Sequence, residues 1–198
     1  MQTLKIGLAV FSSICAIVGF FLYVRDIYSK QTKPHIYTWL IWTITQGTAV
    51  IGVWYGKGGS TCTICLSISA TLVFLTFLYS VKNGIKNITR SDTLVLIITL
   101  LAIVVWWQLH NPILAIFMVS AIDAFGYIPS YRKSWIEPYS ETLTAWAIFC
   151  VGNLSAILAL KEYNFLTLTY LTTVVICNLM VLIILYFRRR ARSIIGTS

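Results

Sequence analysis

Six polar or aromatic side chains in the apolar segments have the chemistry to bind a small solute. They are one acid, three amides and two indoles: Asp123, Gln46, Asn153, Asn178, Trp42 and Trp146. Trp42 and Gln46 lie four residues apart and Trp146 and Asn153 seven apart, so each pair shares one face if its segment is helical. An aromatic plane with an amide beside it can stack on a ring-shaped solute and hydrogen bond to its edge.

The same residues also have a structural interpretation. Amides such as Gln46 and Asn178 join membrane helices to each other, an interaction worth about 0.6 kcal/mol on average, and indoles serve as bulk packing. Asp123 lies midway along an apolar segment, where an ionised carboxylate costs about 2.5–3.5 kcal/mol even on a lenient scale. We therefore expect Asp123 to be protonated, paired or in contact with water. It serves either a proton-coupled step or solute binding, or it bonds to a neighbouring helix.

The elements that must position these residues follow from composition. The chain has 198 residues, of which 58% are hydrophobic and 11% charged, whereas soluble domains carry about 25% charged residues. This excludes a water-soluble enzyme, a disordered tail and a coiled coil. The net charge of +9 comes from short Lys and Arg clusters between apolar segments. That pattern favours a lipid bilayer as the partner of the basic residues and argues against binding of a nucleic acid.

Seven apolar segments are long enough for transmembrane helices, which need about 20 residues. They span residues 4–24, 36–56, 61–82, 92–109, 112–131, 141–160 and 165–187. The chain lacks the regular alternation of a membrane barrel, so the sequence predicts an all-α polytopic fold. We treat residues 1–198 as a single membrane domain.

The positive charges are distributed unevenly over alternate connections. One side holds Arg25, Lys30, Lys33, Lys82, Lys86, Arg90, Arg132, Lys133, Arg188, Arg189, Arg190 and Arg192, and the other holds Lys5, Lys57 and Lys161. Because cytoplasmic loops carry the excess of Lys and Arg, we expect the N-terminus outside and the C-terminus in the cytoplasm. Trp39, Trp54, Trp106, Trp107 and Trp135 lie nearer span ends, where tryptophan forms an interfacial belt.

A shift of 104 residues aligns the first three segments with the last three. The matched pairs include Phe21 with Phe125, Tyr23 with Tyr127, Pro34 with Pro138, Thr38 with Thr142 and Trp42 with Trp146. We therefore predict two parallel three-helix repeats, 4–82 and 112–187, joined by a linker helix at 92–109. Transporters are built from such repeats, with the substrate site at the repeat interface. An accidental alignment of helical membrane sequences is the alternative.

This 3+1+3 architecture resembles the SWEET sugar transporters and their PQ-loop relatives. Pro129-Ser130-Tyr131-Arg132-Lys133-Ser134 is similar to the Pro-Gln motif and the basic stretch after it, and the resemblance implies a helix-hinge role for Pro129. Trp39-x2-Trp42-x3-Gln46 is similar to a motif of nicotinamide riboside transporters. The pattern formed by Asp123, Pro129, Arg132, Lys133, Pro138 and Glu141 resembles that of a bacterial seven-helix family, a likeness that implies no function.

Enzyme motifs are missing from the sequence. It holds no His-Glu-x2-His motif, no glycine-rich phosphate loop and no Ser-His-Asp arrangement at a credible depth, so we expect no catalytic residues and no cofactor. Cys62-x2-Cys65 is either a redox pair or two packing cysteines. No zinc site is expected, because His110 is alone on the predicted outer side and no second His or Cys pair accompanies it there.

These observations predict a small-solute transporter or facilitator in a bacterial or archaeal cell membrane. The expected partners are the bilayer, a neutral solute such as a sugar or nucleoside-like vitamin, and protons, and a homo-oligomer is compatible with the sequence. The alternative function is a receptor or accessory membrane protein that binds a ligand without transporting it. An intramembrane redox enzyme built on Cys62 and Cys65 ranks third.

Overall fold

The computed structural model describes residues 2–55, 60–84, 88–109, 112–160 and 162–195, with some side chains inside these ranges left out. Every element in this part of the chain is helical. The helices are α1 (Gln2–Tyr28), α2 (Ile36–Tyr55), α3 (Ser60–Asn83), α4 (Arg90–Leu109), α5 (Pro112–Gly126), α6 (Ile128–Ile136), the 3-10 turn η1 (Pro138–Ser140), α7 (Leu143–Ala159) and α8 (Phe165–Ile195). The predicted all-α fold class is confirmed.

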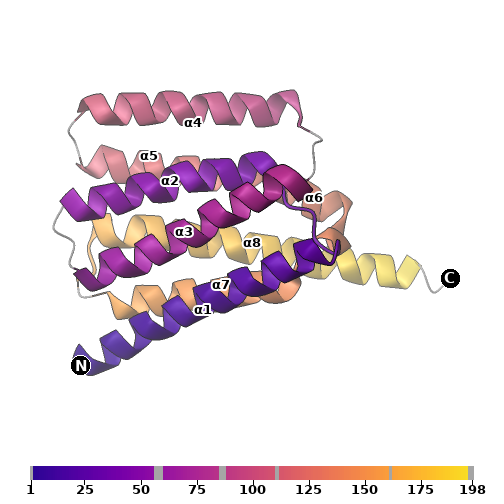
Figure 1. Cartoon of the computed structure of the whole chain (residues 1–198), viewed down its shortest axis with the longest axis horizontal. Coiled ribbons are helices and arrows are strands. Elements are labelled where there is room, and N and C mark those ends of the chain that lie inside the picture. The colour runs from indigo at the N-terminus through magenta and orange to yellow at the C-terminus, as the bar shows by residue number, and fades with distance from the viewer. Residues whose placement is uncertain (1, 56–59, 85–87, 110–111, 161, 196–198) are drawn as a thin grey trace.

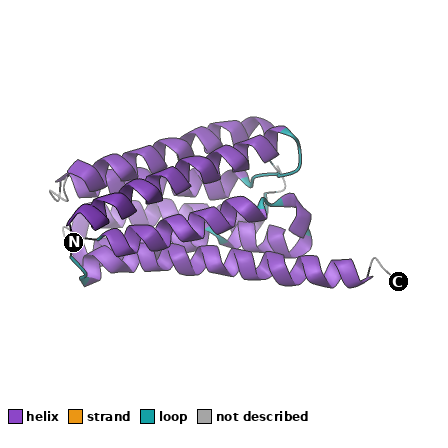
Figure 2. Ribbon diagram, turned by 90° about the horizontal axis from the view of Figure 1, so that it is seen from below, coloured by secondary structure: helices purple, strands orange, loops and turns teal. Residues whose placement is uncertain are grey.

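The long helices lie side by side, and the two termini lie at opposite ends of the bundle (Figures 1 and 2). Within the described residues, three stretches are long and apolar enough to cross a membrane: Gln2–Tyr28, Leu66–Asn83 and Thr167–Ser193. A fourth apolar helix, Leu143–Ala159, is shorter. These helices agree with a location in a membrane.

The surface of the bundle is apolar and its interior contains many polar groups. Phe21 and Leu4 are each 68% exposed, and Phe187 is 61% exposed. Inside the bundle, Thr38 and Thr45 are almost fully buried. Exposed apolar side chains spread over whole helices are unusual for a protein in water, whereas lipid is the natural solvent for them.

Most of the predicted helix boundaries differ from the observed ones, and three of the differences matter for the fold. The predicted span 112–131 is two helices, because the chain breaks between α5 and α6 at Tyr127, whose N–H bonds to the carbonyl of Ala124 three residues back. Helix α7 begins at Leu143 and not at residue 141, since η1 occupies Pro138–Ser140. Helix α8 continues to Ile195, well beyond the predicted end at residue 187.

The helices pack in the same pattern in the two halves of the molecule, which are α1–α3 and α5–α8. Helix α3 packs against both α1 and α2, and α8 packs against both α5 and α7. The two groups meet where α1 packs on α7 and where α2 packs on α5, and α4 lies against α5 and α2. Figure 1 shows α4 at one edge of the bundle and α1 with α7 at the opposite edge. The interface between the halves therefore contains three of the predicted site residues, Trp42 of α2, Asp123 of α5 and Trp146 of α7.

Glycines allow the closest approaches between the halves. A Cβ atom at Gly152 of α7 would lie 2.8 Å from the Cβ of Cys15, and one at Gly19 of α1 would lie 2.5 Å from the Phe149 ring. A Cβ at Gly126 would lie 2.9 Å from the indole nitrogen of Trp42. Small residues at such positions let membrane helices pack closely in the absence of a hydrophobic driving force.

Figure 1 shows α6 and the C-terminus at one end of the bundle, and most of the basic residues in the described elements belong to this end. Arg25, Lys30 and Lys33 lie at the α1–α2 connection, and the C-terminal arginines lie at the end of α8. At the opposite end, the amino group of Lys5 donates to the carbonyl of Leu160, 2.6 Å away. Lys57, Lys86 and Lys161 lie outside the described residues.

Candidate functional site

The two tryptophans of the predicted solute site come together between the halves of the molecule. Trp42 is on α2 and Trp146 on α7, and both side chains are buried. Their ring centroids are 6.1 Å apart with an angle of 72° between the ring planes. This edge-to-face arrangement is a favourable geometry for aromatic pairs. The rings pack against each other at the centre of the interface in this conformation.

Two tyrosines complete this group, which we call the central aromatic cluster: Trp42, Trp146, Tyr23 and Tyr127. Tyr127 lies 4.5 Å from Trp42 and 6.1 Å from Trp146, measured between ring centroids. Tyr23 of α1 lies 6.3 Å from Trp146. Neither tyrosine is among the site residues predicted from the sequence. The signal that identifies them is their equivalence in the 104-residue alignment, which pairs Tyr23 with Tyr127 as it pairs Trp42 with Trp146.

Trp39 belongs to the core and not to an interfacial belt, which corrects the prediction. Its side chain is buried, and its ring lies 5.1 Å from Trp42 and 5.0 Å from Tyr23. Trp135, by contrast, is 56% exposed at the basic end of the bundle, as expected of a belt residue. The side chains of Trp54, Trp106 and Trp107 lie outside the described part of the chain.

Asp123 is buried and connects the two halves of the molecule. Its Oδ1 accepts a hydrogen bond of 2.7 Å from the hydroxyl of Thr45 on α2. The hydroxyl of Tyr170 on α8 is a second neighbour of this carboxyl group. The backbone carbonyl of Asp123 accepts a 3.3 Å hydrogen bond from the indole N–H of Trp42. Asp123 therefore lies beside the central aromatic cluster and bonds to the opposite half through its side chain and its backbone.

The three amides have different surroundings. Asn178 is buried on α8, and its Oδ1 accepts a 3.0 Å hydrogen bond from the hydroxyl of Tyr127, so it contacts the central aromatic cluster. Gln46 accepts a 3.1 Å hydrogen bond from Ser69, within the first half of the molecule. The amide nitrogen of Asn153 donates to the carbonyl of Phe149 in its own helix. The structure thus groups Asn178 with the tryptophans and Asp123, and it gives Gln46 and Asn153 other partners.

Pro129 lies at the start of α6, directly after the break in the helix. Proline is compatible with this position because the first backbone N–H groups of a helix have no partner within it. The side chain of Pro129 is buried, and the next turn begins with a 2.8 Å hydrogen bond from the N–H of Tyr131 to the carbonyl of Tyr127. Tyr127, at the centre of the aromatic cluster, is therefore the joint between α5 and α6.

A second polar region lies at the basic end, in the segment after Pro129. The buried ammonium group of Lys133 forms an ion pair with the buried carboxylate of Glu141. The guanidinium group of Arg132 lies 3.0 Å from the carboxylate of Asp92 and also donates to Thr89. In the sequence, Arg132, Lys133 and Glu141 belong to a pattern that implies no function, and in the structure all three form ion pairs.

His35 is buried next to this region, just before α2. Its Nε2 lies 3.4 Å from Oδ2 of Asp92, and neither ring nitrogen makes a hydrogen bond. Burial lowers the pKa of His35 from its usual value, and the positive charges of Arg132 and Lys133 act in the same direction, while Asp92 opposes them. Burial at this position therefore favours the neutral form of His35.

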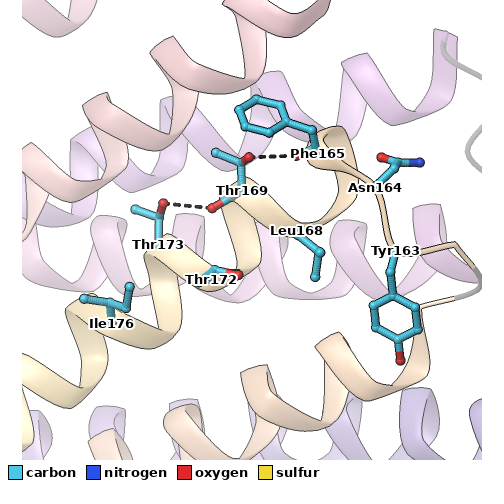
Figure 3. A pocket seen from close by; sticks show the side chains of 8 residues that line it. All are labelled: Tyr163, Asn164, Phe165, Leu168, Thr169, Thr172, Thr173 and Ile176. Atoms are coloured by element: carbon cyan, nitrogen blue, oxygen red, sulfur yellow. Dashed lines mark hydrogen bonds between the residues drawn. The ribbon is translucent and has the colours of Figure 1, made fainter.

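A hollow of about 550 Å³ lies at the other end of the bundle, along the start of α8. Figure 3 shows its lining, which consists of the connection before α8 and the first turns of that helix: Tyr163, Asn164, Phe165, Leu168, Thr169, Thr172, Thr173 and Ile176. Thr169 and Thr173 each donate to a backbone carbonyl one turn back, so their hydroxyls are already satisfied. A surface lined by one helix does not enclose a ligand, so the interface between the halves remains the better candidate site.

The cysteines and acids supply no metal site in the described residues, where no group of three His, Cys, Asp or Glu residues converges. Cys15, Cys150 and Cys177 are free thiols buried in the bundle. The side chains of Cys62 and Cys65 lie outside the described residues, so the redox alternative stays a prediction.

No protein-family model, curated protein or solved structure matches the chain.

Proposed function

We propose that this protein is a seven-span membrane transporter or facilitator for a small neutral solute. The observation that carries the proposal is the meeting of Trp42 and Trp146 at the interface between the two halves, with Asp123 and Asn178 beside them. Aromatic planes with a few polar groups form the usual lining of a small-molecule site. A site between two helix bundles suits alternating access, in which one bundle rocks against the other around a fixed site.

The helix packing supports two parallel repeats. Helices α1, α2 and α3 would form the first, α5, α7 and α8 the second, and α4 the linker, since α3 and α8 each pack between the other two helices of their group. The contact of Tyr23 with Trp146 and that of Tyr127 with Trp42 are exchanged by the 104-residue shift. Contacts that match in this way are expected of a pseudo-twofold axis between the bundles, and they support the proposal of a SWEET-like fold.

The chemistry of the central aromatic cluster favours a neutral, ring-shaped solute. Indole and phenol rings stack on the faces of sugars and bases, while Asn178, Asp123 and the tyrosine hydroxyls offer hydrogen bonds to its edge. The side chains of Trp42 and Trp146 contact each other in this conformation, so a solute between them would require the bundles to separate. A sugar or a nucleoside-like vitamin fits these requirements.

A thermal-shift screen of the purified protein against sugars, nucleosides and vitamins tests the proposal. A ligand that binds only the folded state raises the melting temperature. We expect Trp42→Phe, which keeps a ring but loses area and the indole N–H, to weaken binding of the best ligand by about tenfold, since each tenfold is 1.4 kcal/mol. The matched control is Trp135→Phe, at an exposed position, which should leave binding unchanged. Absence of any ligand in the screen, or equal weakening by both variants, would argue against this site.

The second candidate function is a receptor or accessory protein that binds the same solute and does not transport it. The central aromatic cluster supports this function too, because binding needs the cluster and does not need alternating access. Uptake of the labelled ligand into vesicles that contain the protein distinguishes the two functions: a transporter accumulates or equilibrates the solute, and a receptor binds it at a fixed stoichiometry.

A further inference from the structure

Contacts at the basic end join the two halves of the molecule directly. The ammonium group of Lys133 donates to the backbone carbonyl of Lys33. The N–H of Lys33 donates to the carbonyl of Ser140, 3.2 Å away. The hydroxyls of Thr32 and Thr142 are 2.7 Å apart. The connection between α1 and α2 is thus fastened to the segment between α6 and α7, which closes the basic end of the interface.

Among these contacts, only that of Lys133 is made by a charged side-chain group. Its side chain is 6% exposed, and the side chain of its partner Glu141 is 1% exposed. Removing one partner of a buried ion pair leaves an uncompensated charge, which is strongly unfavourable. The position of the Lys133 ammonium group therefore depends on Glu141.

Glu141 connects this closure to the central aromatic cluster. Its Oε2 accepts a 3.0 Å hydrogen bond from the indole N–H of Trp146. Tyr23, a second ring of the cluster, also lies beside the Glu141 carboxylate. An arginine of α8, Arg189, holds the backbone of Glu141 by donating to its carbonyl at 2.5 Å. The backbone of Glu141 is fixed, so the side chain is the part that responds to Trp146.

We infer that Glu141 and Lys133 form a gate that couples occupancy of the central aromatic cluster to opening of the basic end; this inference rests on the proposed function. A solute that displaces the Trp146 ring removes the indole hydrogen bond from Glu141. The carboxylate then turns with its partner Lys133, which releases the carbonyl of Lys33 in the other half. Glu141 and Lys133 act as positioning residues in this step, and no bond is made or broken in the solute.

The other ion pairs at this end do not join the halves in the same way. Arg132 and Asp92 link α6 to the start of α4. Arg25 and Asp26 are neighbours on α1, and the Arg25 side chain is 60% exposed. An exposed ion pair is worth between about 0 and 1 kcal/mol. Arg25→Met is therefore a matched control, because it removes a charge at the same end without crossing the interface.

The test measures access to a buried residue at the closed end. Thr38 of α2 is fully buried and accepts a 3.5 Å hydrogen bond from Ser130 of α6. Thr38→Cys, in a chain whose five native cysteines are replaced by serine or alanine, reports opening through its rate of reaction with a water-soluble methanethiosulfonate. No solute is present in this measurement.

We expect the neutral double variant Lys133→Met/Glu141→Gln to raise the reaction rate at Thr38→Cys by about tenfold, because a tenfold change in the population of the open state changes the rate in proportion. The reversed pair, Lys133→Glu/Glu141→Lys, should also raise the rate, because a carboxylate at position 133 cannot donate to the carbonyl of Lys33 and an ammonium group at position 141 cannot accept from the indole of Trp146. Arg25→Met should leave it unchanged. A rate equal to that of the parent in the folded double variant overturns the gate.

Trp146→Phe provides a second measurement should the double variant fail to fold. Phenylalanine keeps an aromatic ring at this position but lacks the indole N–H that bonds to Glu141. We expect it to raise the reaction rate at Thr38→Cys, and an unchanged rate would contradict the link between the cluster and the gate. The rates are measured without solute, so they do not depend on transport. If the variants open the basic end but the protein transports no solute, the proposed function is refuted while the gate is retained.

Discussion

At the residue scale, the most informative side chain is Asp123, because it is an acid placed between helices of both halves. Its carboxyl group accepts from Thr45 and neighbours Tyr170. Both neighbours are hydroxyls, and neither carries a positive charge that would compensate a carboxylate. An acid in such surroundings changes its interactions strongly when it gains or loses a proton, so Asp123 is the natural place for a proton to affect the proposed transport.

Asp123→Asn tests this role. Asparagine keeps the shape and an oxygen that accepts from Thr45, so we expect the variant to fold and to bind solute while its uptake loses the pH dependence of the wild type. The measurement is uptake into vesicles between pH 5.5 and 8.5. Glu162→Gln, at an exposed position, is the control. If Asp123→Asn keeps both the magnitude and the pH dependence of uptake, Asp123 is structural and a proton does not act through it.

His35 makes folding stability depend on pH. Burial lowers the pKa of His35, so the unfolded chain binds more protons than the folded protein at pH values below about 6.5, the usual value for histidine. Stability therefore falls as the pH falls from about 6.5 toward the lowered pKa of His35. We expect His35→Phe to reduce this loss, measured as the difference in melting temperature between pH 7.5 and 5.5. His110→Asn is the control, and an equal loss in both variants would contradict the assignment.

The sequence predicted some site residues and not others, for a physical reason. Helical spacing shows which residues share a face, so Trp42 and Trp146 could be predicted as a matched pair. Spacing does not show which neighbouring helix that face meets. Gln46 and Trp42 are one turn apart, yet Gln46 bonds to Ser69 of α3 and Trp42 to Asp123 of α5. Glu141 lies before α7, where only the folded chain brings it to Lys133 and Trp146.

At the element scale, hydrophobicity predicted where the helices lie better than where they end. Helix α8 continues past the apolar segment because its arginines bind the end of α6: Arg188 donates to the carbonyl of Trp135, and Arg192 to that of Ile136. Carbonyls at a helix end need such partners. The sequence marked the change from apolar to basic residues, which is expected at a membrane boundary, but it did not show that the helix itself continues.

The α1–α7 contact depends on a glycine, which allows a prediction for this pair of helices. A Cβ at Gly152 would lie 2.8 Å from the Cβ of Cys15, whereas a Cβ at Gly7 would have no atom within 4 Å. We expect Gly152→Val to destabilise the protein by about 1–3 kcal/mol, as other overpacked sites do, and Gly7→Val to have a much smaller effect. Thermal unfolding in detergent measures both. Equal melting temperatures would mean that α1 and α7 separate at little cost.

At the scale of the whole molecule, the termini lie at opposite ends (Figure 1), and most of the basic residues in the described elements belong to the end with the C-terminus. Basic residues at one end of a membrane bundle favour the cytoplasmic side. The same end carries the contacts of Lys133 with Glu141 and Lys33. If this orientation holds, the conformation described here is closed toward the cytoplasm.

Reporter fusions test this orientation. A reporter fused after residue 193 should lie in the cytoplasm, and one fused after Lys57 should lie outside. The two positions are on opposite sides of the membrane in the seven-span arrangement. Replacing the arginines at 188–190 and 192 with glutamine should weaken the preference for this orientation without changing the helices. The reverse pattern of activity would place the closed end outside and change the direction assigned to the gate.

The long separation along the chain between α1 and α7 has a consequence for biosynthesis. Gly19 packs against Phe149, and Gly152 against Cys15, so the first helix finds its most extensive partner only after most of the chain has been made. At a synthesis rate of about 5–20 residues per second, α1 waits on the order of ten seconds in the membrane with its glycine face unpartnered. During that interval α3 is already available to pack against α1, while lipids or another protein cover the face that later meets α7. The docking of the first helix on α7 is therefore a late step of assembly, and a truncation before residue 143 leaves the glycine face of α1 without its partner.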